Sequence, residues 1–251
     1  MAGYVCAIAG GNGGVGKTTT AINVGTTLQA LDYDVAVIDA DLGMPNIAQM
    51  LDVPFDASLH DILAGRSTIS ETLTSAPGGM TIIPGEPKLE AYADANPRKL
   101  RKVVKTLRRT YDVVIVDTAA GLRKENTVLL ELADGVVLTT VPDHVSLTDT
   151  DKTRQLVEAV DSDIVGVLIV RATAETPMTD IDADFDVPVL GAIPHDPEAS
   201  GAEPMAIESP DSTPAAAYQE LAESLAQVFF EAAKSEQLEM IPTAWLDQTQ
   251  D

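Results

Sequence analysis

Short apolar runs recur along the chain, separated by stretches whose apolar residues follow a helical spacing. Segments such as VVIVD, VVLTT and VGVLIV are apolar at consecutive positions rather than at alternate ones. Strands with two apolar faces are typical of parallel sheets, because helices cover both sides of such a sheet. The runs therefore predict seven buried strands, over residues 4–9, 34–39, 80–84, 112–117, 135–141, 164–170 and 187–193.

The segments between these runs predict helices, over residues 17–31, 58–64, 97–110, 124–133, 147–160 and 214–234. Strands that alternate with helices form βαβ units, so we predict an α/β fold, a doubly wound, mostly parallel sheet with helices on both faces. The acidic segment 175–188 lacks strong apolar periodicity and is interpreted as a surface excursion. We predict one domain over residues 1–234 and a C-terminal tail over 235–251.

The charge balance is strongly acidic, with 39 acidic and 16 basic residues and a formal net charge of −23. Such a surface repels itself in dilute buffer, but the Debye length falls to about 3 Å in 1 M salt. Acidic residues are spread over nearly every predicted loop and helix face. This distribution indicates adaptation to a salt-rich cytoplasm rather than a patch for one basic partner.

Cysteine and membrane signals are sparse. Cys6 is the only cysteine and lies in a predicted strand, which excludes a disulfide framework and a cysteine-rich metal site. No apolar run approaches about 18 residues and no signal peptide opens the chain, so we expect a cytoplasmic protein. The histidines, His60, His144 and His195, are far apart in sequence and are interpreted as surface or ligand-adjacent groups.

The glycine-rich stretch after the first strand satisfies two phosphate-binding patterns at once. Gly11, Gly13 and Gly16 form G-x-G-x-x-G, whereas Gly11 and Gly16 with Lys17 and Thr18 form G-x-x-x-x-G-K-T. The first pattern is typical of a dinucleotide site and the second of a nucleoside-triphosphate site.

Three features favour the triphosphate. Lys17 supplies an ammonium for the β- and γ-phosphates and Thr18 a hydroxyl for Mg²⁺. The strand "YDVVIVD" ends in Asp117, where a carboxylate can hold Mg²⁺ through water. The second strand ends in Asp39-x-Asp41, which adds an acid that could orient a water nucleophile.

Several segments resemble the MinD/ParA branch of P-loop ATPases over roughly residues 3–230. The stretch "NGGVGKTT" (12–19) is similar to that family's K-G-G-x-G-K-[ST]-[ST] loop at every position except the first. "VAVIDADLGMPNIAQML" (35–51) and "DTAAGL" (117–122) resemble the two switch segments. "VPDHVSLTDTDKTRQLV" (141–157), "VPVLGAIPHDPE" (187–198) and "SPDSTPAAAYQELAESLAQ" (209–227) resemble the family's later motifs.

The resemblance implies an ATP- and Mg²⁺-binding P-loop domain and a role for each matching residue. Catalytic roles fall on Lys17, Asp41 and Asp117, and metal roles on Thr18, Asp39 and Asp117. The nucleotide-binding set comprises Gly11, Asn12, Gly13, Gly14, Val15, Gly16, Lys17, Thr18, Thr19, Arg171, Pro194, His195 and Asp196. It also implies a nucleotide-dependent homodimer and a protein cargo or activator.

Two positions depart from the family pattern. Asn12 replaces the lysine that crosses the dimer to the partner's phosphates, and an amide cannot supply the positive charge of a cationic finger, worth about 10³–10⁵ in rate. Arg123 and Lys124 are candidate substitutes, although the favoured interpretation is that they are solvated residues at the start of a helix. Val170 stands before Arg171 where relatives have Asn, which leaves base recognition less defined. Iron–sulfur relatives are excluded because one cysteine cannot ligate a cluster.

Two further segments carry partner signals. Residues 98–109 contain seven of the 16 basic residues around one apolar helical stripe, which is typical of a DNA-contacting face or of a solvated helix. The tail contains Leu238, Ile241, Trp245 and Leu246 but is acidic and interrupted by Pro242, which disfavours anchoring to anionic lipid and favours docking on protein. The leading hypothesis is a slow, cytoplasmic MinD/ParA-like ATPase that positions division or polar machinery, with a peripheral location at the membrane or cell pole as the alternative location. The alternative is a nucleotide-binding scaffold with little hydrolysis.

Overall fold

The computed structural model describes residues 2–121 and 124–231, which contain one sheet of eight strands. The strand order is β3-β4-β2-β5-β1-β6-β7-β8, and every neighbouring pair is parallel except β3 and β4. The strands are β1 (Tyr4–Ala9), β2 (Val35–Ala40), β3 (Thr74–Ser75), β4 (Thr81–Ile83), β5 (Val113–Thr118), β6 (Gly135–Thr140), β7 (Ile164–Ala172) and β8 (Val189–Pro194). The predicted doubly wound, mostly parallel sheet is confirmed, and the two-residue edge strand β3 is an addition to it.

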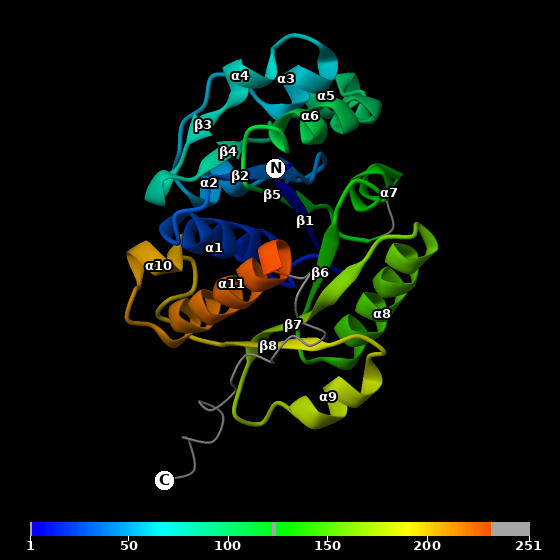
Figure 1. The fold of residues 1–251 in the computed structure, drawn as a ribbon, viewed down its shortest axis with the longest axis vertical. Coiled ribbons are helices and arrows are strands. Elements are labelled where there is room, and N and C mark those ends of the chain that lie inside the picture. The colour runs from blue at the N-terminus through cyan, green and yellow to red at the C-terminus, as the bar shows by residue number, and fades with distance from the viewer. Residues whose placement is uncertain (1, 122–123, 232–251) are drawn as a thin grey trace.

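Helices cover both faces of the sheet, with α1 and α11 on one face and α3, α6, α7 and α8 on the other (Figure 1). The helices are α1 (Lys17–Ala30), α2 (Ile47–Met50), α3 (Leu59–Ala64), α4 (Ile69–Thr72), α5 (Leu89–Asp94), α6 (Leu100–Leu107), α7 (Lys124–Leu130), α8 (His144–Ala159), α9 (Met178–Asp184), α10 (Met205–Glu208) and α11 (Thr213–Glu231). The predicted tail, 235–251, lies outside the described residues.

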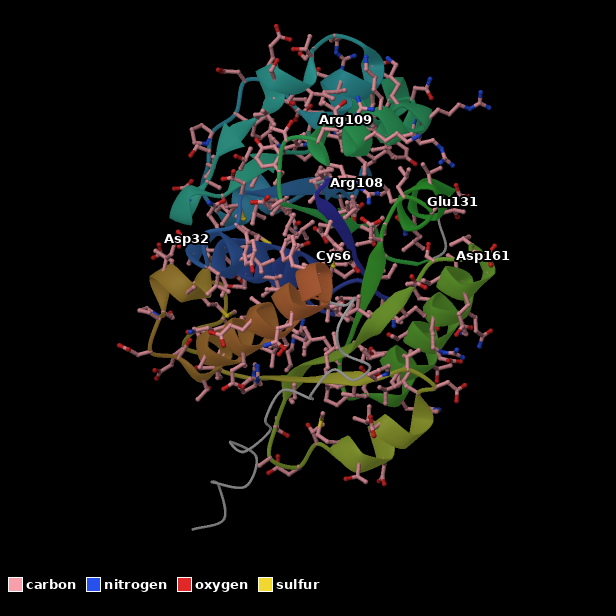
Figure 2. The ribbon with its side chains drawn as sticks, in the orientation of Figure 1. Cys6, Asp32, Arg108, Arg109, Glu131 and Asp161 are labelled. Carbon is pink, nitrogen blue, oxygen red and sulfur yellow. The ribbon has the colours of Figure 1, made fainter. Side chains whose placement is uncertain are left out.

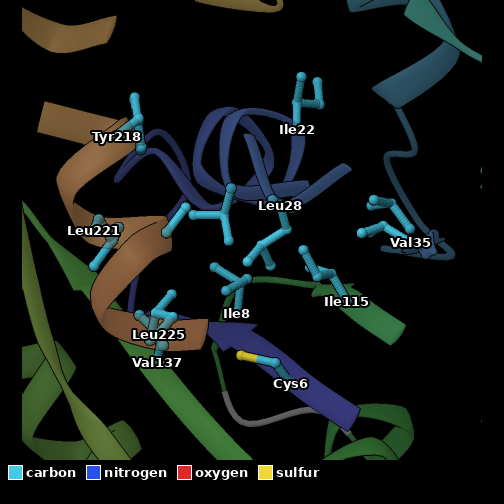
Figure 3. Packing of buried hydrophobic residues seen from close by; sticks show 14 of the residues in the cluster. Cys6, Ile8, Ile22, Leu28, Val35, Ile115, Val137, Tyr218, Leu221 and Leu225 are labelled. Carbon is cyan, nitrogen blue, oxygen red and sulfur yellow. The ribbon is translucent and has the colours of Figure 1, made fainter. Parts of the chain in front are cut away.

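The core between the sheet and the two helices α1 and α11 contains fully buried side chains from all three. Figure 3 shows Ile8 from β1, Leu28 from α1 and Leu221 from α11 meeting there. Burying such an aliphatic side chain contributes about 1.5–3 kcal/mol. Cys6 lies in the same cluster, and burial raises the pKa of its thiol to about 12. The cysteine is therefore a small core residue.

Two predicted helices differ clearly from the structure, and a capping contact explains the first difference. α8 begins at His144 rather than at residue 147 because the Asp143 carboxylate accepts hydrogen bonds from the backbone N–H groups of Val145 and Ser146. The predicted helix 97–110 is divided into a single turn of 3₁₀-helix (Pro97–Lys99) and α6.

Two sequence interpretations were wrong. The segment 175–188, interpreted as a surface excursion, contains α9, which buries Ile181 and leads into buried Phe185. His60, interpreted as a surface or ligand-adjacent group, is fully buried in α3. Its Nδ1 accepts from the N–H of Glu86 at 3.0 Å, so its Nε2 donates to the carbonyl of Leu42 at 2.9 Å. His60 thereby joins the loops that follow β2 and β4.

The carboxyl ends of the parallel strands form one edge of the sheet, and the order of connections reverses about β1. β5, β2 and β4 lie on one side of β1, and β6, β7 and β8 on the other. Ligands of open α/β sheets bind in the crevice outside such a reversal. The loops after β1, β2, β5, β7 and β8 all open into this region.

Candidate functional site

The loop between β1 and α1 leaves an uncapped helix N-terminus facing the carboxyl edge of the sheet. α1 begins at Lys17 with no side-chain cap and no acidic residue in its first turn. Gly16 has φ of 82°, and a Cβ there would lie 2.9 Å from the Val170 side chain, so only glycine fits. Free N–H groups and the positive end of the helix dipole together form a site for an anion such as phosphate.

Lys17 points back into this loop. Its Nζ donates to the backbone carbonyl of Asn12 at 3.0 Å, and the side chain is only 7% exposed. Burial lowers the pKa of the ammonium, while the nearby carboxylates of Asp117 and Asp41 act in the opposite direction. A buried ammonium held by one carbonyl is suited to receive a stronger acceptor, such as a phosphate oxygen.

Thr18 and two buried aspartates form a polar cluster beside the loop. The Thr18 hydroxyl donates to Asp117 Oδ2 at 2.7 Å, and Asp117 is the register partner of Asp39 on the neighbouring strand. Asp39 Oδ2 accepts from the N–H groups of Asn46 and Ile47, both at 2.9 Å, and so caps α2.

Both aspartates keep one buried oxygen, Oδ1, without a hydrogen-bond partner. Burial, followed by the effect of neighbouring carboxylates, raises the pKa of Asp117 well above its usual range. Burial also raises the pKa of Asp39 to about 7. Two orphaned carboxylate oxygens beside a hydroxyl fit a hydrated Mg²⁺, which prefers one or two carboxylates together with water and phosphate oxygens. Within the described residues, no group of three or more His, Cys, Asp and Glu side chains could hold a metal ion by itself.

Asp41 lies across the loop from this cluster. Its Oδ1 accepts from the N–H groups of Gly43 at 3.2 Å and Met44 at 3.0 Å. A cavity of about 480 Å³ is lined by Lys17, Thr18 and Asp41, together with residues of both switch segments. The structure thus brings together the three residue types that the sequence assigned to phosphate, metal and water.

The side chain of Asn12 does not line this cavity and instead contacts α8 of its own chain. It hydrogen-bonds the carboxylate of Asp149, which also pairs with Lys152 Nζ at 2.7 Å. Gly11 is required beside it, because a Cβ there would lie 2.4 Å from the Asp149 backbone. The candidate substitute cations are not tested, since Arg123 lies outside the described residues and only the backbone position of Lys124, at the start of α7, is described.

A second, smaller cavity of about 160 Å³ adjoins the other side of the loop. It is lined by Arg171, Pro194, His195 and Asp196 of the predicted nucleotide-binding set, together with Gly16 and Thr19. A register shift between β7 and β8 at Val170–Ala172 turns Arg171 outward, and its guanidinium donates to the carbonyl of Gly14. The arrangement places a cation directly on the phosphate loop.

Sequence reasoning missed Glu203, which lines the same small cavity. Its carboxylate accepts from Asn23 Nδ2 at 2.6 Å and is also hydrogen-bonded by Thr19. Burial raises the pKa of Glu203 to about 7. Nothing in the sequence marks this residue except its place before Pro204, which indicates only a helix start.

Comparison with known proteins identifies the family. A family model described as CbiA, the CobQ/CobB/MinD/ParA nucleotide-binding domain, matches residues 6–204. The chain belongs to this family. The resemblance seen in the sequence motifs is confirmed.

Individual relatives match over most of the chain. An uncharacterised ATP-binding protein of Methanocaldococcus jannaschii is 33% identical over 234 residues, covering 90% of this chain and 89% of the relative. The septum site-determining protein MinD of Pyrococcus horikoshii, solved with Mg-ADP, superposes with a TM-score of 0.85 at 30% identity, covering 92% of this chain and 99% of that one. A MinC:MinD cell division complex of Aquifex aeolicus matches with a TM-score of 0.79 at 25% identity, covering 95% and 100%.

No helix in the described part of this family member is both long and apolar enough to cross a membrane.

Proposed function

We propose that this chain binds ATP with Mg²⁺, hydrolyses it slowly, and uses the nucleotide state to control self-association and the positioning of division or other polar machinery. The observation that carries the proposal is a cavity lined by Lys17 and Thr18 at an uncapped helix N-terminus, with the buried Asp117 carboxylate accepting from the Thr18 hydroxyl. The Mg-ADP bound by the Pyrococcus relative supports the choice of ligand.

The chain's own groups would divide the binding work as follows. Lys17 exchanges the Asn12 carbonyl for β- and γ-phosphate oxygens, and the N–H groups of residues 13–17 donate to the same phosphates. Thr18 and Asp117, with Asp39 on the neighbouring strand, would hold the metal, which would neutralise phosphate charge. Asp41, partly exposed at the edge of the cavity, orients the attacking water.

The small cavity would take the nucleoside. Pro194 and His195 flank the base, and the Glu203 carboxylate is placed to accept a ribose hydroxyl. Thr19 lies between Glu203 and the phosphate loop, which suits contact with the α-phosphate.

Asn12 supports slow turnover. It carries no charge, and its amide is committed to Asp149 on the same chain rather than extended toward a partner's phosphates. Cationic fingers contribute about 10³–10⁵ in rate, so their absence at this position lowers turnover.

The surface around the large cavity supports self-association. Met44, Leu89 and Val145 are 75%, 78% and 63% exposed, and they follow β2, β4 and β6 at the carboxyl edge. Exposed apolar side chains that gather on one face mark interaction surfaces. We propose that two copies associate through this face when nucleotide is bound, and that a further protein acts as cargo or activator.

Phosphate release in molar KCl with Mg²⁺-ATP tests the proposal. We expect slow release that disappears in Lys17→Ala, because that change removes the ammonium without touching the core. Release equal to that of the Lys17→Ala control would contradict hydrolysis and leave the nucleotide-binding scaffold. Light scattering with and without nucleotide, compared with Met44→Asp, tests self-association in the same samples.

A further inference from the structure

A groove of about 540 Å³ lies between α3, α4 and α6, and it shares no lining residue with the two nucleotide cavities. Its floor is apolar and consists of Ile62, Ile69, Leu73, Val103 and Leu107. Tyr111, in the loop before β5, lines it as well. An apolar hollow of this size on a surface otherwise crowded with carboxylates is suited to cover by apolar side chains.

The rim of the groove carries unpaired positive charge. Lys99 and Lys102 line it, and neither makes an ion pair within the described residues. Two other cations of the same segment are paired, Arg101 with Glu131 and Arg108 with Asp134. In a chain of net charge −23, cations without partners beside an apolar groove indicate an acidic, amphipathic occupant.

The chain contains such a segment immediately after α11. Residues 232–251 include four acidic residues and one lysine, together with five large apolar side chains. The apolar residues are Leu238, Met240, Ile241, Trp245 and Leu246.

A chain of contacts through the start of β1 connects the end of α11 with the loop before β5, which lines one end of the groove. Phe229 stacks on Tyr4 with ring centroids 4.1 Å apart, so the last turn of α11 lies beside the start of β1 (Figure 1). The backbone N–H of Tyr4 in turn donates to the carbonyl of Asp112, next to Tyr111. The carbonyl of Arg108, which follows α6 and is labelled in Figure 2, accepts from the backbone N–H of Gly3 at 2.7 Å.

The length of the segment is sufficient. Trp245 lies fourteen residues beyond Glu231, which allows a reach of up to about 46 Å. From the end of α11 to the groove, the segment would pass the amino ends of β1 and β5, which are neighbouring strands about 4.8 Å apart.

We propose that residues 236–247 of this chain bind in the groove between α3, α4 and α6, with their apolar side chains on its floor and their carboxylates beside Lys99 and Lys102. The groove is thus an intramolecular docking surface on the sheet face opposite α1 and α11.

Trp245 is the only tryptophan and therefore a native probe. In the full chain at the lowest salt that keeps it folded, we expect blue-shifted emission and protection from acrylamide relative to the urea-unfolded chain. Lys99→Glu/Lys102→Glu should lose that protection. The matched control, Arg98→Glu/Lys105→Glu, reverses two charges of the same segment that do not line the groove and should keep it.

Two further variants separate charge from apolar contact. Adding Glu236→Lys/Glu239→Lys to the Lys99→Glu/Lys102→Glu variant should restore protection, because the signs again match. In molar KCl, where exposed charges are screened, Leu73→Asp should expose Trp245, while Leu89→Asp, outside the groove, should not.

Four results would overturn the proposal. The first is a wild-type Trp245 as accessible to acrylamide as in urea. The second is protection that survives both Lys99→Glu/Lys102→Glu at low salt and Leu73→Asp. Protection that rises with protein concentration would place the segment on a second copy. The fourth is duplex DNA binding that is lost in Lys99→Glu/Lys102→Glu while the Trp245 emission of that variant is unchanged. It would show that Lys99 and Lys102 bind nucleic acid instead.

Discussion

Asp39→Asn is expected to stabilise the nucleotide-free protein and to weaken its response to magnesium. The carboxamide keeps an oxygen that can accept from the N–H groups of Asn46 and Ile47, so the cap of α2 survives. The substitution also removes the buried charge of the Asp39 carboxylate, which is paired in register with Asp117 on the neighbouring strand. Because burial first, and Asp41 to a lesser extent, raise the pKa of Asp39 from 3.8 to about 7, the ionised carboxylate costs the folded state at most about 4 kcal/mol.

The sign of the pH dependence follows from that raised pKa. Between pH 3.8 and about 7 the folded state binds more protons than the unfolded state, so the wild-type stability falls as the pH rises through this window. The gain from Asp39→Asn should therefore be small near pH 4 and largest above pH 7.

Urea unfolding at pH 5 and pH 8, without nucleotide and then with ATP and Mg²⁺, measures both effects. Asp52→Asn, at an exposed position, is the control and should change neither. An Asp39→Asn variant that is less stable than wild type at pH 8, yet keeps the full stabilisation by Mg²⁺-ATP, would refute the reasoning.

Three further predictions follow from other contacts. Asn12→Lys should raise ATP turnover, with Lys17→Ala as the inactive control, and an unchanged rate would contradict the proposed dimer geometry. Burial raises the pKa of Glu203 to about 7. The free energy of unfolding of Glu203→Gln, measured in urea without nucleotide, should therefore rise by about 2 kcal/mol relative to that of wild type between pH 5 and pH 8. Parallel pH profiles of the two proteins would contradict the raised pKa. Cys6, fully buried with a thiol pKa raised to about 12, should react with a thiol reagent only after urea unfolding, and reaction in the folded protein would contradict its burial.

Most of the fold followed from the sequence because parallel strands buried on both faces leave an unambiguous apolar signal. β1 and β5 were predicted within one residue at each end. Several short elements, among them β3, α2 and α9, were missed, because their few residues show no periodicity and tertiary contacts form them. α2, for example, begins where Asp39, seven residues earlier than Asn46, supplies the cap.

The same division applies to the candidate site. The phosphate loop and Asp117 were found because their chemistry is local to a strand end and a glycine-rich turn. The role of Glu203 and the Asn12–Asp149 contact were not found, because both depend on residues far apart in the sequence. Glu203 and Asn23 are 180 positions apart, and Asn12 and Asp149 are 137 positions apart. His60 was misread for the same reason, since its two backbone partners are separated from it by 18 and 26 residues.

The central claim is that the loop before α1 holds a magnesium-bearing triphosphate through Lys17, Thr18 and Asp117. Calorimetric titration of ATP in concentrated KCl, with and without Mg²⁺, tests it most directly. The account predicts binding heat that requires Mg²⁺ and is lost in Lys17→Ala. Absence of any magnesium-dependent heat, with ATP or another nucleoside triphosphate, would contradict it.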